Sequence, residues 1–415
     1  MNYREALAWL YSTQGLGIKL GLDNMRRLLD RVGPGEAQSP VHSCPRILHV
    51  AGTNGKGSVC AMLDAICRAA GLRTGLFTSP HLITYRERIR LNGAMIPENA
   101  VAAGLNRLRN ATAGWEYPPT FFELTTALAL DWFRQEQAEI IVLETGLGGR
   151  LDSTNAVTPA VTALTPISID HAQYLGTTLE SIATEKAGIF KSGVPAVSAA
   201  QPEEAARVIE AAAARLGIPL QWVTTPAPCE VALPGSHQKL NAALAIAALQ
   251  AASIPVSEEA IRRGLREVVW PGRFQQHPLP SGQTLILDGA HNEAAARRLA
   301  QTWREVYGEE ENAVVILSVL GDKDCAAICR ELSPLAAEFI VTPISNPRSC
   351  TGEALAQKVR EYAPGVPCGV AASVGEALKK AEAGGKRLLV TGSLFLIGET
   401  LALLEGREPE FASVQ

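Results

Sequence analysis

The sequence lacks several features that would define particular classes of protein. No apolar run approaches the ~20 residues that a membrane-spanning helix needs, and the first residues lack the basic start and long apolar middle of a signal peptide. There is no excess of positive charge, because the formal net charge is −4 and the pI is about 6.1. The eight cysteines show no CxxC spacing and no paired framework. We therefore expect a cytoplasmic protein with neither a membrane nor a nucleic acid as its partner.

The sequence also has no short-period repeat and no low-complexity tract. With 47% apolar and 19% charged residues its composition is that of an ordinary globular protein. At 415 residues the chain is too long for one hydrophobic core. Two domains are therefore the expected organisation.

A glycine-rich stretch near the start gives the clearest chemical signal. Residues 46–51 are an apolar run typical of a buried strand, Gly52-Thr53-Asn54-Gly55-Lys56-Gly57-Ser58 follows, and a helix is expected over 57–70. Glycines let backbone N–H groups approach an anion, Lys56 would reach outer phosphates, and Ser58 could offer its hydroxyl to phosphate or metal. Gly52 lies only three places before Gly55, so this is a variant of the general P-loop. A loop that merely turns a strand into a helix is the alternative, but it gives no reason for the lysine and serine.

Polar side chains also follow later strands of the first half. Ser79, Glu144 and His171 each stand just beyond an apolar run. Alternating strands and helices predict a largely parallel sheet, so these groups can converge on one edge with Lys56. The further elements expected here are strands over 73–78, 140–143 and 161–165 and a helix over 121–136.

The pattern pauses near residues 270–273, and a second series of strands and helices follows. We place the domain boundary there, with domains at 1–272 and 273–415. The first strand of the series ends in Asp288-Gly289-Ala290-His291-Asn292, and the series has no second glycine–lysine loop. A smaller doubly wound domain is expected. Its strands are expected over 284–288, 313–319, 338–342, 367–371 and 387–391, and its helices over 292–305, 324–332, 351–362, 374–383 and 394–404.

The residues alone leave several roles open. Mg²⁺ prefers oxygen ligands, and we expect the Glu144 carboxylate to be exposed at the sheet edge, although a surface glutamate in a turn would look the same. Ser79 could be a hydroxyl ligand or a turn serine. A lone histidine such as His171 is more often structural, since imidazole is not the usual Mg²⁺ ligand. Lys186 has the pattern of a helix-surface lysine, which gives it no role.

Motifs along nearly the whole chain resemble those of the Mur ligase superfamily and, more closely, folylpolyglutamate synthases, including their bifunctional dihydrofolate synthase form. The motifs are residues 17–22 (GIKLGL), 49–58 (HVAGTNGKGS), 78–82 (TSPHL), 85–89 (YRERI), 120–123 (TFFE), 144–155 (ETGLGGRLDSTN), 170–171 (DH), 185–189 (EKAGI), 271–274 (PGRF), 288–292 (DGAHN) and 391–393 (TGS).

The resemblance implies an α/β fold with a Mur-ligase-like P-loop ATPase domain and a smaller Rossmann-like C-terminal domain. It also implies an ATP-dependent amide ligase. ATP phosphorylates a folate carboxylate to an acyl phosphate, the amino group of L-glutamate attacks, and ADP and phosphate are released. The implied cofactors are two Mg²⁺ ions and a CO₂-derived carbamate on Lys186. A monomer that takes a reduced folate is expected, and dihydropteroate remains an open second substrate.

The resemblance also assigns residues to these roles. The ATP-binding set is Asn54, Gly55, Lys56, Gly57, Ser58, Asn241, Arg273 and Asp288. The metal ligands are Ser79, Glu144, His171 and carbamylated Lys186. The catalytic residues are Lys56, Lys186 and His291, and the glutamate-binding residues are His291 and Ser393. The folate-binding set is Thr120, Phe121, Phe122, Glu123, Leu151, Asp152 and Ser153.

Three points remain open at this level. Lys19 stands where some bifunctional members have an aspartate, so dihydropteroate activity is undecided. Arg86, Arg88 and Arg90 would share one strand face and suit an anionic polyglutamate tail, but a solvated, salt-bridged face is the alternative. The function itself has two alternatives. One is a Mur-type amino-acid ligase acting on another carboxylate. The other is a P-loop nucleotide switch without ligation, which leaves the segment around Lys186 unexplained.

Overall fold

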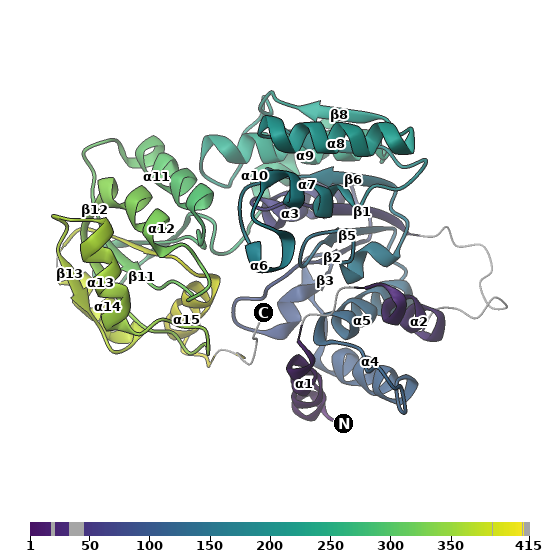
Figure 1. Cartoon of the computed structure of the whole chain (residues 1–415), viewed down its shortest axis with the longest axis horizontal. Helices are drawn as coiled ribbons and strands as arrows, with labels where there is room; N and C mark the ends of the chain where they lie inside the picture. The colour runs from purple at the N-terminus through teal and green to yellow at the C-terminus, as the bar shows by residue number, and fades with distance from the viewer. Residues whose placement is uncertain (18–20, 33–44, 384, 409, 411–415) are drawn as a thin grey trace. The chain divides into compact units, whose positions relative to one another are not determined.

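The computed structural model describes residues 1–17, 21–32, 45–383, 385–408 and 410. Lys19, in the first motif of the resemblance, lies outside the described residues. The chain divides into two compact units (Figure 1). The first comprises residues 1–80, 86–231 and 239–268, and the second comprises 81–85, 232–238 and 269–415. The functional boundary expected between residues 272 and 273 stays a prediction.

The first unit is built on an eight-stranded sheet in the order β4-β3-β2-β5-β1-β6-β7-β8. The neighbours in the run β2-β5-β1-β6-β7-β8 are all parallel, whereas β3 pairs antiparallel with both β2 and β4. The mostly parallel sheet expected from the sequence is confirmed. Its strands are β1 (Arg46–Ala51), β2 (Thr74–Phe77), β3 (Ile89–Leu91), β4 (Ala94–Met95), β5 (Ile140–Glu144), β6 (Val161–Leu164), β7 (Ala196–Ala199) and β8 (Leu220–Val223).

Helices of the first unit pack on this sheet through apolar side chains. Helices α7 and α8 bury residues such as Ile182 and Ile209 in one cluster with Ala51, Leu164 and Ala196 of β1, β6 and β7. The helices, numbered through the chain to α10, are α1 (Tyr3–Ser12), α2 (Asp23–Val32), α3 (Lys56–Ala69), α4 (Glu98–Ala111), α5 (Phe121–Gln135), α6 (Ala172–Leu175), α7 (Leu179–Ala187), α8 (Glu203–Leu216), α9 (Ser236–Ala251) and α10 (Glu258–Glu267). The short 3₁₀ turns are η1 (Thr13–Leu16), η2 (Tyr85–Arg88) and η3 (Ser153–Ala156).

One helix pair in this unit is in backbone contact. Gly264 of α10 faces α3 so closely that a Cβ at this position would lie 2.6 Å from the Cα of Ile66. Only glycine allows such an approach without a shift of one helix. Helix α10 is therefore packed directly against the helix that follows the glycine loop.

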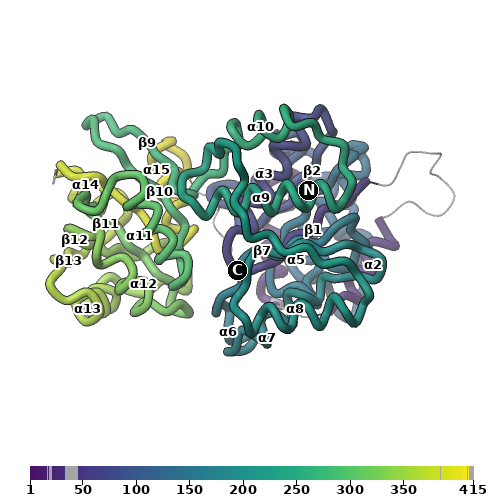
Figure 2. The backbone as a smooth tube through the Cα atoms, turned by 90° about the horizontal axis from the view of Figure 1, so that it is seen from above, coloured from purple at the N-terminus to yellow at the C-terminus, as the bar shows by residue number. Residues whose placement is uncertain are grey.

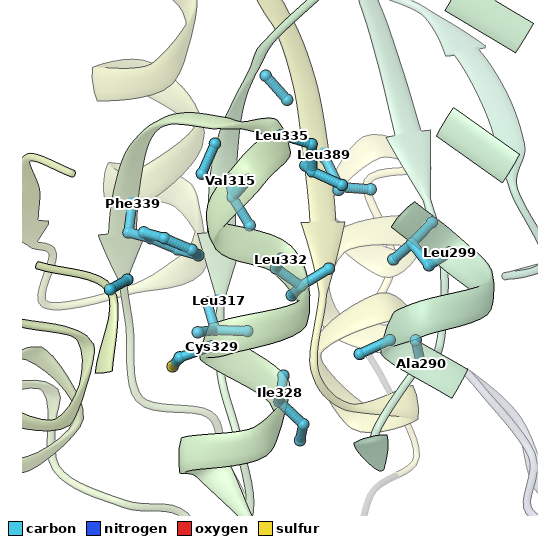
Figure 3. Packing of buried hydrophobic residues seen from close by; sticks show 14 of the residues in the cluster. Ala290, Leu299, Val315, Leu317, Ile328, Cys329, Leu332, Leu335, Phe339 and Leu389 are labelled. Atoms are coloured by element: carbon cyan, nitrogen blue, oxygen red, sulfur yellow. The ribbon is translucent and has the colours of Figure 1, made fainter. Parts of the chain in front are cut away.

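The second unit is a three-layer sandwich around a six-stranded sheet in the order β13-β12-β11-β14-β10-β9. Figure 2 shows helices α11, α12 and α13 on one face of the sheet and α14 and α15 on the other. Residues alternate between the two faces. Val315 and Leu317 pack in the cluster with α11 to α13 (Figure 3), and Val314 and Ile316 pack in the cluster with α14 and α15. Both faces of the strands are therefore buried, as in doubly wound folds.

The elements of the second unit closely follow those expected from the sequence. They are β9 (Gln275–Pro278), β10 (Thr284–Leu287), α11 (Glu293–Tyr307), β11 (Ala313–Leu317), α12 (Cys325–Leu332), η4 (Ser333–Leu335), β12 (Ala336–Val341), α13 (Gly352–Tyr362), β13 (Cys368–Val370), α14 (Val374–Glu382), β14 (Arg387–Thr391) and α15 (Leu394–Leu404). The antiparallel edge strand β9 was not expected. Among the described residues, every helix is too short or too polar to cross a bilayer.

Candidate active site

The glycine loop connects β1 to α3 in the strand–loop–helix order that the sequence predicts. Gly55 has a left-handed backbone with φ +91°, and a Cβ there would lie 3.0 Å from Oδ1 of Asn241. Gly57 and Ser58 lie in the first turn of α3, and the first-turn N–H groups of a helix point towards its N-terminal end, where an anion can bind. The Nζ of Lys56 folds back and donates to the carbonyl oxygens of Gly52 and Thr53, both at 3.2 Å. The loop thus brings Asn54 to Ser58 and Asn241, all predicted to bind ATP, to one place.

Lys186 of α7 reaches the same loop from the side. Its Nζ donates to the Gly52 carbonyl oxygen at 2.8 Å, so this oxygen accepts from both lysines and their nitrogens lie within about 6 Å of each other. The side chain is buried, with 4% of the residue exposed. The surface position that the helical pattern suggested is therefore wrong. Burial, with a smaller contribution from the charge of Lys56, lowers the Lys186 pKa to about 7, although Asp170 and Asp152 oppose the shift.

Glu144 ends β5, the strand beside β1, and its carboxylate is buried rather than exposed as expected. The backbone N–H of Ser79, which follows β2, donates to Glu144 Oε2 at 3.1 Å. Glu144 also lies close enough to α3 to affect Cys60. Burial first and then the charge of Glu144 raise the Cys60 pKa well above its usual value. Two of the predicted metal ligands, Ser79 and Glu144, are therefore neighbours.

His171 lies at the end of the loop that follows β6, on the other side of β1. It has a left-handed backbone with φ +51°, immediately precedes α6, and is exposed. Its backbone N–H donates to Asp170 Oδ1 at 2.8 Å. In the described part of the chain, no three His, Cys, Asp or Glu side chains are gathered as a metal site. The predicted ligand set contains only two residues of these types, Glu144 and His171.

The segment predicted to bind folate begins α5 with a capping box. Thr120 and Glu123 are buried and bonded to each other, with the Thr120 hydroxyl donating to Glu123 Oε2 at 2.9 Å. The ring of Phe121 stacks on Tyr11 with centroids 5.4 Å apart. Phe122 lies against Gly146, where a Cβ would be 2.4 Å from the ring. Both phenylalanines thus already have packing partners in the protein.

Asp152 organises the loop that follows Glu144. Its Oδ2 accepts from the backbone N–H groups of Gly146 and Leu147 at 2.9 and 2.8 Å, and its Oδ1 accepts from the Thr154 N–H at 2.9 Å. The Thr154 hydroxyl also donates to Oδ1 and lies 2.9 Å from Nε2 of His49. Of the other predicted residues, Ser153 is buried in η3 and Leu151 is half-buried.

His49 and Thr154 were not singled out by the sequence analysis. Burial, with a smaller contribution from Lys191, lowers the His49 pKa to about 3, so the imidazole is neutral. Since the Thr154 hydroxyl proton goes to the carboxylate, His49 must donate through Nε2–H. Both residues stand inside motifs quoted above, but nothing in those motifs pairs them. A buried chain from His49 through Thr154 to Asp152 therefore joins β1 to the glycine loop after β5.

The second unit has its own group of predicted site residues at the carboxyl ends of β10 and β14. Asp288 is half-buried and accepts from the N–H groups of Phe274 and Ala290 at 2.8 and 2.9 Å. Burial raises its pKa, and the nearby Arg273 opposes that shift. His291 Nδ1 lies 2.7 Å from the Gly289 carbonyl oxygen, and Ser393 caps α15. Because β10 and β14 are parallel neighbours, these loops share one edge.

The arginines proposed for a polyglutamate tail do not share a strand face. Arg86 and Arg88 lie in the 3₁₀ turn η2, and only Arg90 is in β3. Arg88 has no exposed surface, and its guanidinium lies 5.3 Å from the centroid of the Phe121 ring. Arg86 pairs with Glu98 at 3.5 Å. The alternation expected from i, i+2, i+4 spacing is wrong here because the strand begins only at Ile89.

Comparison with known protein families places these features in one class. Residues 50–215 match the Mur ligase middle domain, and residues 272–394 match the Mur ligase glutamate ligase domain. The two matches fall on the two sheets described above, so the fold and the candidate site define a Mur-type ligase.

Individual relatives narrow the class to one family. A dihydrofolate synthase/folylpolyglutamate synthase of Bacillus subtilis is 37% identical over 84% of this chain and 86% of its own length. Among solved structures, E. coli FolC in complex with DHPP and ADP has a TM-score of 0.86 and 33% identity, over 97% of this chain and 98% of that chain. The bifunctional folylpolyglutamate synthase/dihydrofolate synthase of Yersinia pestis, complexed with AMPPNP and Mn ion, has a TM-score of 0.83 and 33% identity, over 98% of each chain. The chain belongs to the dihydrofolate synthase/folylpolyglutamate synthase family.

Proposed function

We propose that this chain joins the carboxylate of a reduced folate to the amino group of L-glutamate, using ATP and releasing ADP and phosphate. The observation on which this depends most is the pair of lysines, Lys56 and Lys186, that meet at the Gly52 carbonyl oxygen of the glycine loop. A nucleotide switch needs only the loop lysine. The second, buried lysine is explained by a ligase, in which its proposed carbamate would place a negative charge beside the phosphates.

The reaction takes place in two steps, phosphorylation of the carboxylate and attack by the amine. A folate carboxylate oxygen attacks the γ-phosphorus of ATP, the bond to the β-phosphate oxygen breaks, and ADP leaves. The amino nitrogen of glutamate then attacks the acyl carbon of the acyl phosphate, the carbon–oxygen bond breaks, and phosphate leaves as the nitrogen loses a proton. In this scheme residues 54–58 hold the phosphates of ATP. Lys56 turns from the carbonyl oxygens of Gly52 and Thr53 towards the outer phosphates.

A divalent metal ion, Mg²⁺ in our proposal, fits the donors near the loop. Ser79 and Glu144 are adjacent and offer a hydroxyl and a buried carboxylate, the oxygen ligands that Mg²⁺ prefers. We assign Ser79, Glu144 and His171 as the ligands of two ions, together with modified Lys186. When bound, the metal supplies positive charge that stabilises the transferred phosphoryl group.

The carbamate on Lys186 is supported by the low pKa of this residue. Only the neutral amine adds to CO₂, and with a pKa of about 7 about half of the Lys186 side chain is neutral at pH 7. The addition turns a cation that is repelled by Lys56 into an anion that is attracted to it. A buried ammonium is thereby replaced by a group that suits both Lys56 and a metal ion.

We assign the glutamate to the second unit, consistent with the glutamate ligase domain that residues 272–394 match. His291 and Ser393 are the proposed glutamate contacts, and Arg273 and Asp288 the proposed nucleotide contacts. Residues 1–272 would then form the ATP-binding domain and residues 273–415 the glutamate-ligase domain. For the folate we assign the segments at 120–123 and 151–153. The names of the relatives and of their DHPP and ADP complex support these substrate classes.

The decisive experiment compares acceptors. ADP release should depend on L-glutamate plus tetrahydrofolate, and the amide product should form in equal amount to ADP. Dihydropteroate in place of tetrahydrofolate decides whether the chain is also a dihydrofolate synthase. Turnover with a UDP-linked peptide precursor, and none with either pterin substrate, would instead indicate a Mur-type ligase for another carboxylate. ATP hydrolysis without amide formation under all conditions would contradict ligation.

We further propose that the enzyme acts as a monomer in the cytoplasm. Sedimentation velocity at working concentration, with and without ATP analogue, tests the monomer directly.

A further inference from the structure

The segment Thr165–Ser168, between β6 and the loop that ends at His171, is held by its surroundings rather than by regular secondary structure. The Thr165 N–H donates to the Ala51 carbonyl oxygen at 2.8 Å, which ends the pairing of β6 with β1. Beyond this point almost every backbone polar group of the segment is bonded to one of two flanking loops. A segment fixed in this way depends on a small number of side chains.

Thr53, in the glycine loop, holds the segment from one side. Its hydroxyl donates to the Ser168 carbonyl oxygen and accepts from the Ser168 N–H, both at 3.1 Å. Its backbone N–H, and that of Asn54, donate to the Pro166 carbonyl oxygen at 3.1 and 3.3 Å. The Asn54 side chain donates to the Ser168 hydroxyl at 3.2 Å. Thr53 and Asn54 are thus both engaged with this segment.

Gln201, in the loop after β7, holds the segment from the opposite side. Its Oε1 accepts from the Ile167 N–H at 2.8 Å, and its Nε2 donates to the Thr165 carbonyl oxygen at 3.1 Å. Nε2 also donates to the Ser198 hydroxyl at 3.3 Å, which ties the amide to the end of β7. Side chains from two loops therefore replace the missing ladder bonds of residues 165–168.

Two of the residues that follow lie at the surface. Ile169 is 48% exposed, and His171 is exposed with its backbone in the left-handed region. The backbone of His171 is bonded to its chain neighbours, through the Asp170 carboxylate and the N–H groups of Tyr174 and Leu175, and residues 165–168 join this turn to the sheet. We infer that Thr53 and Gln201 are positioning residues for the metal site, which fix His171 in place by clamping Thr165–Ser168 to the glycine loop and to β7. The inference rests on the proposed role of His171 as a metal ligand.

The first test removes the Thr53 hydroxyl without changing the shape of the side chain. Thr53→Val loses both bonds to Ser168, and Thr53→Ser keeps them. Binding of Mn²⁺ in the presence of AMPPNP is measured from the electron paramagnetic resonance signal of free Mn²⁺, without turnover. Loss of groups that orient metal ligands typically weakens metal affinity by about 10–100-fold, and we expect a loss in this range for Thr53→Val and recovery in Thr53→Ser. Unchanged Mn²⁺ affinity in Thr53→Val would overturn the inference.

The second test asks whether the effect passes through His171. In a His171→Ala background, Thr53→Val should cause little further loss of Mn²⁺ affinity, because the ligand that it positions is already absent. An equal loss in both backgrounds would refute positioning through His171 and leave the ligand assignment intact. If His171→Ala alone binds Mn²⁺ normally, the assignment in the proposed function fails instead.

The clamp itself has a readout that does not depend on the metal. The amides of Ile167 and Ser168 donate to Gln201 and Thr53, so hydrogen exchange in the peptide that covers residues 165–171 should speed up in Gln201→Met and Thr53→Val. Gln221→Met, the same change at an exposed position of β8, serves as the matched control and should leave both exchange and Mn²⁺ binding unchanged. Unaltered exchange in a folded Gln201→Met protein would show that the clamp is not needed.

Discussion

Replacing Lys186 by methionine should inactivate the enzyme and yet make it more stable. The lysine is buried, and its pKa is lowered from 10.5 to about 7, first by burial and then by the charge of Lys56. At a pH between these two values the unfolded chain binds the proton and the folded chain does not. The free energy of unfolding therefore rises with pH in this window. Below pH 7 both states bind the proton, and the folded chain bears the full cost of a buried cation.

The size of the effect follows from the shift. At pH 8 Lys186 is protonated in the unfolded chain and mostly neutral in the folded chain. Removing its proton at pH 8, about 2.5 pH units below the unfolded-state pKa of 10.5, costs the folded state about 3 kcal/mol. Methionine has a similar length and no charge, which removes this cost. It also loses the bond to the Gly52 carbonyl oxygen, worth about 1 kcal/mol. The net gain of about 2 kcal/mol corresponds to roughly 4–8 °C in Tm.

The assay is thermal unfolding of both proteins in CO₂-depleted buffer between pH 7 and 9. The advantage of Lys186→Met should shrink as the pH rises, because the wild-type lysine loses its proton. Adding bicarbonate should raise the Tm of the wild type alone if the carbamate forms. A variant less stable than the wild type at pH 8, or an advantage that does not change with pH, would refute the reasoning.

Further expectations concern single groups around the loop. Lys56→Ala should abolish ATP-dependent amide formation with an unchanged circular dichroism spectrum, and near-normal turnover would contradict its phosphate role. Glu144→Gln should raise the Mg²⁺ concentration for half-maximal activity by roughly tenfold or more, so an unchanged magnesium titration would argue against a ligand. Gly52→Ala should lose about 2–4 kcal/mol in chemical denaturation, since its Cβ would lie 1.9 Å from Oγ1 of Thr165. Thr154→Val should lose about 2–3 kcal/mol by leaving Nε2 of His49 without its partner and by removing the hydroxyl bond to Asp152, and Thr154→Ser should restore the stability.

The fold was largely predictable because its elements have strong local signals. Apolar runs such as residues 140–143 and 313–317 are long enough, and the turns between them distinct enough, to mark parallel strands that are buried on both faces. The short hairpin of β3 and β4 was not predicted. The strand expected over residues 86–90 begins only at Ile89, and strands of two or three residues are too short for their periodicity to give the bounds. Bounds for the elements between residues 172 and 269 were not predicted.

Burial of the charged site residues was harder to predict than their convergence at one edge of the sheet. Glu144 and Lys186 were expected at the surface because hydropathy assigns charge to solvent, yet each is buried against a partner from a distant part of the chain. The fully buried Arg88 was misjudged for the same reason. The bonds of Thr53 with Ser168 and of His49 with Thr154 join residues more than 100 positions apart. No local pattern contains such pairs, because they arise only when parallel strands align their ends.

The backbone contact between Gly264 and Ile66 limits how this enzyme can respond to its nucleotide. A helix held without any intervening side chain cannot slide or rotate to accommodate a ligand, so α3 is a rigid support on which the phosphate-binding turn is mounted. Any adjustment on binding must therefore be made by the loops. Position 264, which is none of the proposed ligand contacts, thus becomes a place where one added methyl group would disturb nucleotide affinity from the back of the helix.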